Sequence, residues 1–186
     1  MNAIELLEKQ HEEAKGLFKR LEDANGGEQK KIFEELAANL VAHDAIERQI
    51  FYPACEKAMG MTDELGEALV EHGVIEFSLY EADQAKGRKD FKFKWTVLQE
   101  ILEHHIEEEE DEFFPKAEKA IGKEGLEKLG TKMQQAFEKA LEEDYRTPLH
   151  KNLKQVLAGA IKPSPNGGAR GKKALGRSAN HARASR

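Results

Sequence analysis

One motif occurs twice in this chain and limits how it can fold. In each copy a histidine is followed by glutamate at the fourth position, phenylalanine at the eighth, an aromatic residue at the ninth and proline at the tenth. The copies span residues 43–53 and 105–115. A lone histidine precedes each copy: His43 follows His11 by 32 positions, and His105 follows His72 by 33. This internal repeat indicates two helical hairpins of one plan.

Apolar residues recur at helical spacing through most of the chain. Good helix formers dominate and the chain has only five prolines, so the fold class is predicted to be all-α. Glycine-containing breaks separate the periodic stretches, and Thr62 is the expected N-cap of the third helix. Helices are predicted over residues 2–24, 28–59, 62–86, 90–121 and 124–144, with a short helix after Pro148.

Short connections between long helices favour antiparallel neighbours. The sequence therefore predicts an up-down four-helix bundle over residues 1–121. Residues 122–160 are expected to form an additional helical stretch that packs on this bundle, and residues 161–186 a disordered basic tail.

The charge distribution separates an acidic body from this basic tail. The net charge is −6, yet residues 162–186 hold seven basic residues and no acid, so the remainder carries −13. A basic tail could bind nucleic acid or an acidic partner without sequence specificity. It lacks interleaved aromatic residues, which favours the alternative of a solubilising extension and makes nucleic acid an unfavoured partner.

Cysteine usage and the N-terminus give an expected location. Cys55 is the only cysteine, so no disulfide can form within the chain, which fits a reducing compartment. Charges are spread through the first fifteen residues, which excludes a signal peptide or membrane span there. We expect a cytoplasmic protein with no membrane partner. The oligomeric state is not predicted.

Each of the four long helices carries a histidine that interrupts its apolar stripe. In the second helix, Leu40, His43 and Glu47 follow one another at helical spacing, and Leu102, His105 and Glu109 do so in the fourth. Residues four apart share a helix face. These polar side chains should therefore face the axis of the bundle.

Buried carboxylates without a partner are costly. No lysine or arginine lies on these stripes near the polar layer, so a pair of metal cations is the expected source of positive charge. Imidazole and carboxylate suit iron, manganese or zinc, and the lack of ligating cysteines argues against a structural zinc site. The predicted ligands are His11, His43, Glu47, His72, His105 and Glu109.

Other polar residues receive weaker assignments. Glu76 lies one turn after His72 and is either a further metal ligand or the partner of a hydrogen bond or rim salt bridge. His104 points about 100° away from His105, so a supporting or surface role is expected. Most of residues 107–112 should be a solvated acidic face. His150 and His181 are expected at the surface.

At these residues the chain resembles the hemerythrin family, in particular its bacterial HHE cation-binding branch. The resemblance covers about residues 1–121 and includes the Phe-Tyr-Pro and Phe-Phe-Pro endings of the repeat. It implies a non-haem di-iron centre of two iron ions with an oxo or hydroxo bridge. Glu47 and Glu109 would be bridging carboxylates, with His11 and His43 on one iron and His72 and His105 on the other. An open position would admit O2, NO or peroxide.

Two departures from the oxygen-carrying hemerythrins stand out. Glu76 occupies the place of a second histidine in the third helix, and Glu109 stands four residues after the last histidine where those proteins have aspartate at five. A more anionic ligand set favours ferric iron and lowers the redox potential, which argues against simple reversible oxygen carriage.

Three functions compete at this point. The first is a binding protein that senses, stores or buffers O2, NO, peroxide or iron. The alternative is a di-iron redox enzyme that consumes peroxide or nitric oxide, ranked second because no dedicated acid–base residue or electron-transfer cysteine motif is present. A ferritin-like oxidase would need a repeated Glu-x-x-His, and only Glu8 and His11 have that spacing.

Overall fold

The computed structural model describes residues 1–158, and its helices lie close to the predicted positions. This part of the chain contains helices and no strand, which confirms the all-α class. None of its helices is long and apolar enough to span a membrane. The predicted tail over residues 161–186 lies outside the described residues. The α-helices are α1 (Ala3–Asp23), α2 (Gly26–Ile46), α3 (Tyr52–Met59), α4 (Asp63–Ala85), α5 (Phe91–Glu108), α6 (Phe114–Ile121), α7 (Lys123–Ala140) and α8 (Arg146–Leu157).

Local sequence signals explain where two of the helices begin. The Asn2 side chain accepts hydrogen bonds from the backbone amides of Ile4 and Glu5, and the Glu5 carboxylate accepts the Asn2 amide in return. This reciprocal capping box satisfies amides that the first turn leaves free. Thr62 accepts the Leu65 amide at the start of α4, as predicted.

Two π-helical turns interrupt the helices that were predicted to be continuous over residues 28–59 and 90–121. The turn η1 spans Glu47–Phe51 between α2 and α3, and η2 spans Glu109–Phe113 between α5 and α6. Each ends two residues before the proline of the motif. Because proline has no amide hydrogen and its ring crowds the preceding turn, the helix loses an α-type bond there in any case. It widens at that point without ending.

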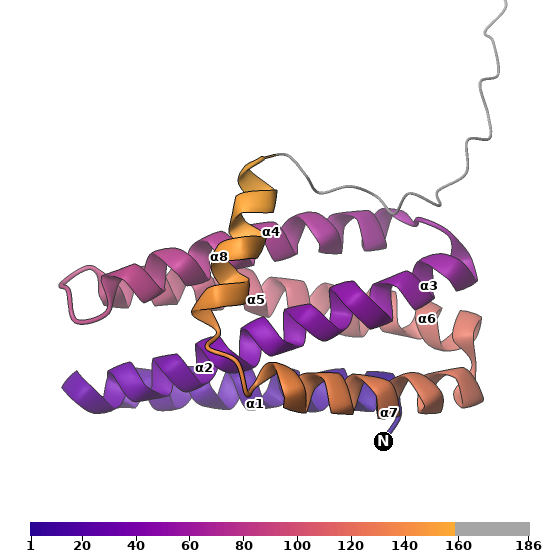
Figure 1. The fold of residues 1–186 in the computed structure, drawn as a ribbon, viewed down its shortest axis with the longest axis horizontal. Coiled ribbons are helices and arrows are strands. Elements are labelled where there is room, and N and C mark those ends of the chain that lie inside the picture. Colours follow the sequence, from indigo (N-terminus) through magenta and orange to yellow (C-terminus); the bar gives the residue numbers. More distant parts are fainter. Residues whose placement is uncertain (159–186) are drawn as a thin grey trace, which may run out of the picture.

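The long helices pack as two hairpins (Figure 1). Helix α1 packs against α2 and α4 packs against α5, and the two pairs meet through α2 with α4 and α1 with α5. Helix α7 lies along α1 and α2, whereas α8 packs across α4 at a steep angle (Figure 1). The last two helices therefore cover the bundle on different sides.

The apolar core is divided into two clusters by a polar layer. One cluster contains Phe18, Phe33 and Trp95, and the other contains Leu7 and Phe113. Along α1 and α4 the residues of one cluster precede the histidine and those of the other follow it. Along α2 and α5 the same division holds except for Ala42 and Ile106, which adjoin the histidine in sequence. Burial of both clusters fixes the helices relative to one another, which holds the polar layer at the middle of the bundle.

Candidate metal centre

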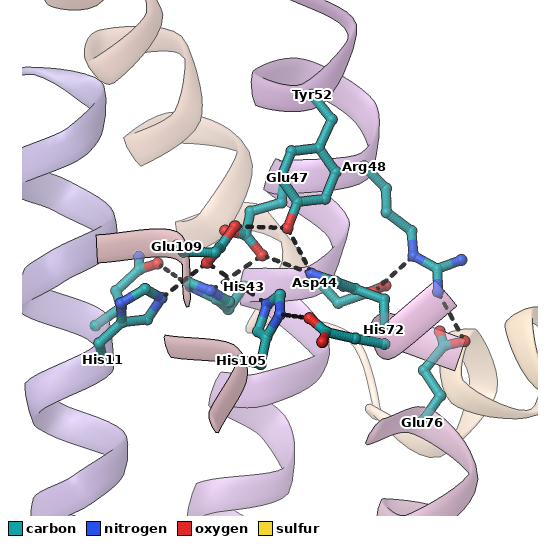
Figure 2. Close-up of polar contacts among 12 residues, drawn as sticks. His11, His43, Asp44, Glu47, Arg48, Tyr52, His72, Glu76, His105 and Glu109 are labelled. Carbon is teal, nitrogen blue, oxygen red and sulfur yellow. Dashed lines mark hydrogen bonds and ion pairs between the residues drawn. The ribbon is translucent and has the colours of Figure 1, made fainter. Parts of the chain in front are cut away.

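The polar layer brings together the six side chains that were predicted as ligands (Figure 2). All six are at most 7% exposed. They form two groups that share Glu47, and within each group the ligand atoms lie within 4.8 Å of one another. The first group is His11, His43, Glu47 and Glu109, and the second is Glu47, His72 and His105.

Each central carboxylate contacts one imidazole from each hairpin. Glu47 Oε2 lies 3.1 Å from His43 Nε2 and 3.2 Å from His72 Nε2. Glu109 Oε2 lies 3.5 Å from Nε2 of both His11 and His105. The two glutamates therefore connect the two halves of the bundle at the same level.

Several polar atoms at this centre are buried without a hydrogen-bond partner among the described residues. They are Nε2 of His11 and His105, both carboxylate oxygens of Glu47, and Oε2 of Glu109. An unsatisfied buried polar group costs about 1–3 kcal/mol, and native proteins contain few of them. Imidazole nitrogens and carboxylate oxygens are also the donor atoms that iron, manganese and zinc accept. The residues present therefore fit a metal centre.

The other ring nitrogen of each histidine is held by an oxygen outside the centre. Because these oxygens can only accept, Nδ1 is the donor in every case. This bond fixes the ring orientation and leaves Nε2 directed inward, as is usual for metal-ligating histidines. The pairs are His43 with Gln10 at 2.8 Å, His72 with Asp44 at 2.6 Å, His105 with Glu71 at 2.7 Å, and His11 with Glu110 at 2.8 Å.

The sequence analysis did not select these four supporting residues, although the repeat carried a signal for two of them. Gln10 and Glu71 each precede a lone histidine, and each bonds the histidine of the adjoining helix in its own hairpin. Asp44 and Glu110 have no equivalent in the other copy. Glu110 lies in the run that was expected to be mostly solvated, yet its carboxylate binds His11.

Tyr52 is a further residue at the centre that the sequence analysis missed. Its hydroxyl donates to Glu109 Oε1 at 2.7 Å and lies 2.7 Å from His72 Nε2. The side chain is 3% exposed. Phe114 holds the corresponding place in the other copy and stacks on His11, with ring centroids 5.9 Å apart. The phenol oxygen is therefore one polar difference between the two halves, in addition to Asp44 and Glu110.

Glu76 lies outside both groups of ligand atoms and pairs with an arginine (Figure 2). The Arg48 guanidinium lies 3.1 Å from Glu76 Oε2 and 2.8 Å from Asp44 Oδ1. Arg48 is not on the apolar stripe of its helix, yet its long side chain brings a basic group to the edge of the polar layer. Burial and then the Asp44 carboxylate raise the pKa of Glu76 to about 7, against the opposing effect of Arg48.

The charges at the centre shift the titration of its members in opposite directions. Burial opposes ionisation of Glu47, but His43 and His72 outweigh it and hold the pKa of that carboxyl well below its usual range. Burial and then the neighbouring Glu47 raise the pKa of Glu109. Two carboxylates at one site thus favour different protonation states unless further positive charge is present.

A small cavity adjoins the centre on one side. Its volume is about 20 Å³, enough for roughly one water-sized molecule. Its polar lining includes His43, His72 and His105, and its apolar lining includes Leu40 and Leu102. A small uncharged molecule could therefore lie against three of the imidazoles.

The remaining histidines of the described region lie apart from the centre. His104 is exposed and its Nε2 lies 3.3 Å from a Glu108 oxygen. His150 is also exposed and packs edge-on against Tyr80. The surface positions predicted for His104 and His150 are thus observed, and His181 lies outside the described residues.

Comparison with known proteins gives matches along most of the chain. The family model described as hemerythrin HHE cation binding domain matches residues 2–117. The uncharacterised proteins Rv2633c of Mycobacterium tuberculosis and Mb2666c of Mycobacterium bovis are each 30% identical over 137 residues, covering 72% of this chain and 83% of theirs.

A solved structure also matches. The crystal structure of a hemerythrin HHE cation binding domain-containing protein of Mycobacterium kansasii, described as an Rv2633c homolog, aligns with a TM-score of 0.67 and 27% identity. The alignment covers 86% of this chain and 94% of that one.

Proposed function

Because the chain belongs to the hemerythrin HHE cation-binding family, we propose that its central histidines and glutamates hold two iron ions as a non-haem di-iron centre. The protein then binds or senses O2, NO or peroxide, or buffers iron. The two packed hairpins of residues 1–121 form the antiparallel four-helix bundle of this domain. Residues 122–158 are an addition that covers it.

The observation that carries this proposal is the buried Glu47 carboxylate. Neither of its oxygens has a hydrogen-bond partner among the described residues, and Nε2 atoms of His43 and His72 lie on the same oxygen. Cations at this point would satisfy both oxygens and neutralise the charge. The bundle would otherwise bear the cost of several unsatisfied buried groups.

The proposed ligands follow the two groups of side chains. His11 and His43 hold one iron, His72 and His105 hold the other, and Glu47 and Glu109 join the two. Bound iron would supply a Lewis-acidic and redox-active centre that can take up a small ligand. Because both hairpins contribute ligands, the packing of one hairpin against the other orients the ligands.

Two residues outside the six predicted ligands also have proposed roles. The Tyr52 hydroxyl, between His72 and Glu109, offers a further oxygen donor to the centre. Glu76 acts through the Arg48 guanidinium, which also contacts Asp44 and so helps to hold His72.

The cavity beside the imidazoles supports a small ligand. Its volume of about 20 Å³ suits a diatomic gas or peroxide better than an organic substrate. Its largely apolar wall favours O2 and NO, which lose little hydration on entry. Gas and peroxide binding therefore rank above chemistry on larger molecules.

Metal analysis and optical spectroscopy test the proposal together. The purified full-length protein should contain two irons per chain, and its visible spectrum should change when the reduced protein meets O2 or NO. Fewer than one tightly bound metal per chain would refute the proposed centre. Metal at full content with no spectral response to either gas or to peroxide would leave iron buffering as the function.

Tyr52 favours a second candidate function, a redox enzyme that consumes peroxide or nitric oxide. A buried phenol hydroxyl beside the centre is a candidate proton donor to a bound ligand, and this is the kind of group that the sequence analysis found lacking. Sustained loss of peroxide in the presence of a reductant, over many equivalents per chain, would support the enzyme. A single stoichiometric adduct without turnover would support the binding protein.

A further inference from the structure

An acidic cavity leads from the surface to the centre between α4 and the segment that joins α5 to α6. It has a volume of about 30 Å³, and six of its lining residues are Glu64, Glu67, Glu71, Glu108, Glu109 and Glu112. Glu109 is the buried member, at 1% exposed, and its Oε2 has no hydrogen-bond partner among the described residues. The cavity therefore connects exposed carboxylates with a proposed metal ligand.

At the outer side of this cavity lies a second group of potential ligands. Donor atoms of Glu71, His104 and Glu108 lie within 4.8 Å of one another. The His104 and Glu108 side chains are 63% and 42% exposed, whereas that of Glu71 is 23% exposed. One imidazole and two carboxylates form a suitable donor set for a first-row divalent cation.

The charge around the cavity is mostly uncompensated. Lys116 pairs with Glu64 at 2.5 Å. No lysine or arginine within residues 1–158 forms an ion pair with Glu67, Glu108 or Glu112. A cleft lined by one sign of charge raises the local concentration of the opposite ion and its rate of association.

Glu71 joins the outer group to the inner one. One of its oxygens accepts the Nδ1 hydrogen of the buried His105 at 2.7 Å, and the same carboxylate belongs to the exposed group with His104. Glu109 follows Glu108 directly in the chain and lines the same cavity. Only a short distance along one polar wall therefore separates the two sites.

We propose that Glu71, His104 and Glu108 form a docking site for a divalent cation, from which the acidic cavity leads the ion inward to Glu109. The site would hold the ion only briefly, because two of its three side chains are largely exposed to solvent. This inference rests on the proposed metal centre. It adds the route by which that centre is filled.

The test measures how fast the full chain, freed of metal by a chelator, takes up Co2+. Cobalt absorbs in the visible when it enters a nitrogen- and oxygen-rich site, so stopped-flow absorbance follows filling of the buried centre. The double variant His104→Gln with Glu108→Gln removes the docking site without touching a buried ligand. It should fill roughly tenfold more slowly at low cobalt concentration, and reach the same final cobalt content.

Glu107→Gln is the matched control. Glu107 is exposed on the same helix, next to Glu108, and its substitution removes the same charge without changing the cavity lining. Its filling rate should equal that of the unsubstituted protein. High salt should reduce the difference between the double variant and the control.

The outcomes separate the two proposals. Equal filling rates in all three proteins, with equal final cobalt, would overturn the docking site and leave the buried centre standing. A lower final cobalt content in the double variant would also overturn it, because the residues would then support the buried centre. Uptake of less than one cobalt per chain by the unsubstituted protein would refute the buried centre, and the docking site with it.

Discussion

Glu47 and Glu109 each occupy the first position of a π-helical turn. The Glu47 carbonyl accepts the Tyr52 amide and the Glu109 carbonyl accepts the Phe114 amide, so each bond spans five residues. Such turns are rare and occur often at functional sites. Here they place both central carboxylates at matching points of the repeat, directly opposite the imidazoles of the other hairpin.

The two adjacent histidines of α5 should differ sharply in their effect on metal binding. His105 is buried and directs Nε2 to the centre, whereas His104 is exposed. We expect His105→Ala to lose at least one metal per chain and His104→Ala to keep the full content. Elemental analysis of the purified proteins measures this. Full iron in the His105 variant would contradict the assignment.

Removal of the Tyr52 hydroxyl should change the electronic spectrum of the ferric protein. If the phenol oxygen is a donor to iron, the unsubstituted protein has a visible phenolate charge-transfer band, and Tyr52→Phe lacks it. Tyr80→Phe is the control, since Tyr80 packs against His150 away from the centre. A band of equal strength in all three proteins, at equal iron content, would exclude Tyr52 as a donor.

Metal uptake should release protons, and His72 should be one source. Burial alone would lower its pKa, but the bond to Asp44 and the contact with Glu47 raise the pKa of His72 to about 10 in the protein without a cation. His72 is therefore protonated at pH 8, and a metal must displace that proton. The apparent affinity for the metal should therefore rise with pH up to about 10, the pKa of His72.

A pH indicator in weakly buffered solution measures these protons. Asp44→Asn removes the strongest partner of His72, so its pKa should fall and fewer protons should be released per metal at pH 8. The raised pKa of His72 also makes stability depend on pH. The pairing of charged His72 stabilises the cation-free fold fully below the ordinary histidine pKa of about 6.5. This stabilisation is lost as pH rises through about 10. Proton release that is the same in both proteins would refute this account.

Glutamate-to-glutamine changes at two buried positions should separate a ligand from a supporting residue. Glu47→Gln removes a central carboxylate charge and should abolish full metal loading. Glu76→Gln keeps an oxygen near Arg48 and should retain both metals, with an affinity loss no larger than the 10- to 100-fold typical of outer partners. Competition with a chelator of known affinity measures both. Equal loss in the two variants would make Glu76 a ligand.

A glycine in α7 should be required for close packing. A β-carbon at Gly130 would lie 2.6 Å from backbone atoms of Met1 and Asn2, which cap α1. Gly130→Ala should lower the free energy of unfolding by about 1–3 kcal/mol. Gly16→Ala in α1 meets nothing within 4 Å and should raise it by about 0.5–1 kcal/mol. Urea denaturation of both variants compares the two effects. If both substitutions stabilised the protein, α7 would not pack closely against the N-terminal residues.

Helical periodicity was enough to predict the helices and to find the side chains that meet at the centre. A histidine within an apolar stripe faces inward whatever the details of packing, because the buried stripe fixes the rotation of its helix. Duplication then paired Glu109 with Glu47 and so selected Glu109 from a run of neighbouring acids. These inferences depend only on spacing along regular helices.

The missed residues are those for which regular spacing fails. A π-helical turn adds a residue, so every side chain after it is rotated by about 100° from its place in an unbroken helix. Tyr52 directly follows such a turn and reaches the centre for that reason. Arg48 was missed because its long side chain reaches past its own helix face to Asp44 and Glu76.

The division of the centre between two hairpins has a consequence for how the chain matures. Each central carboxylate contacts one histidine from α1 or α2 and one from α4 or α5, so neither hairpin alone offers a complete set. The contacts within each hairpin are local and can form early, whereas retention of metal requires both halves to have docked. Iron content would therefore report whether folding is complete, and a chain that had folded only its first hairpin would retain no metal.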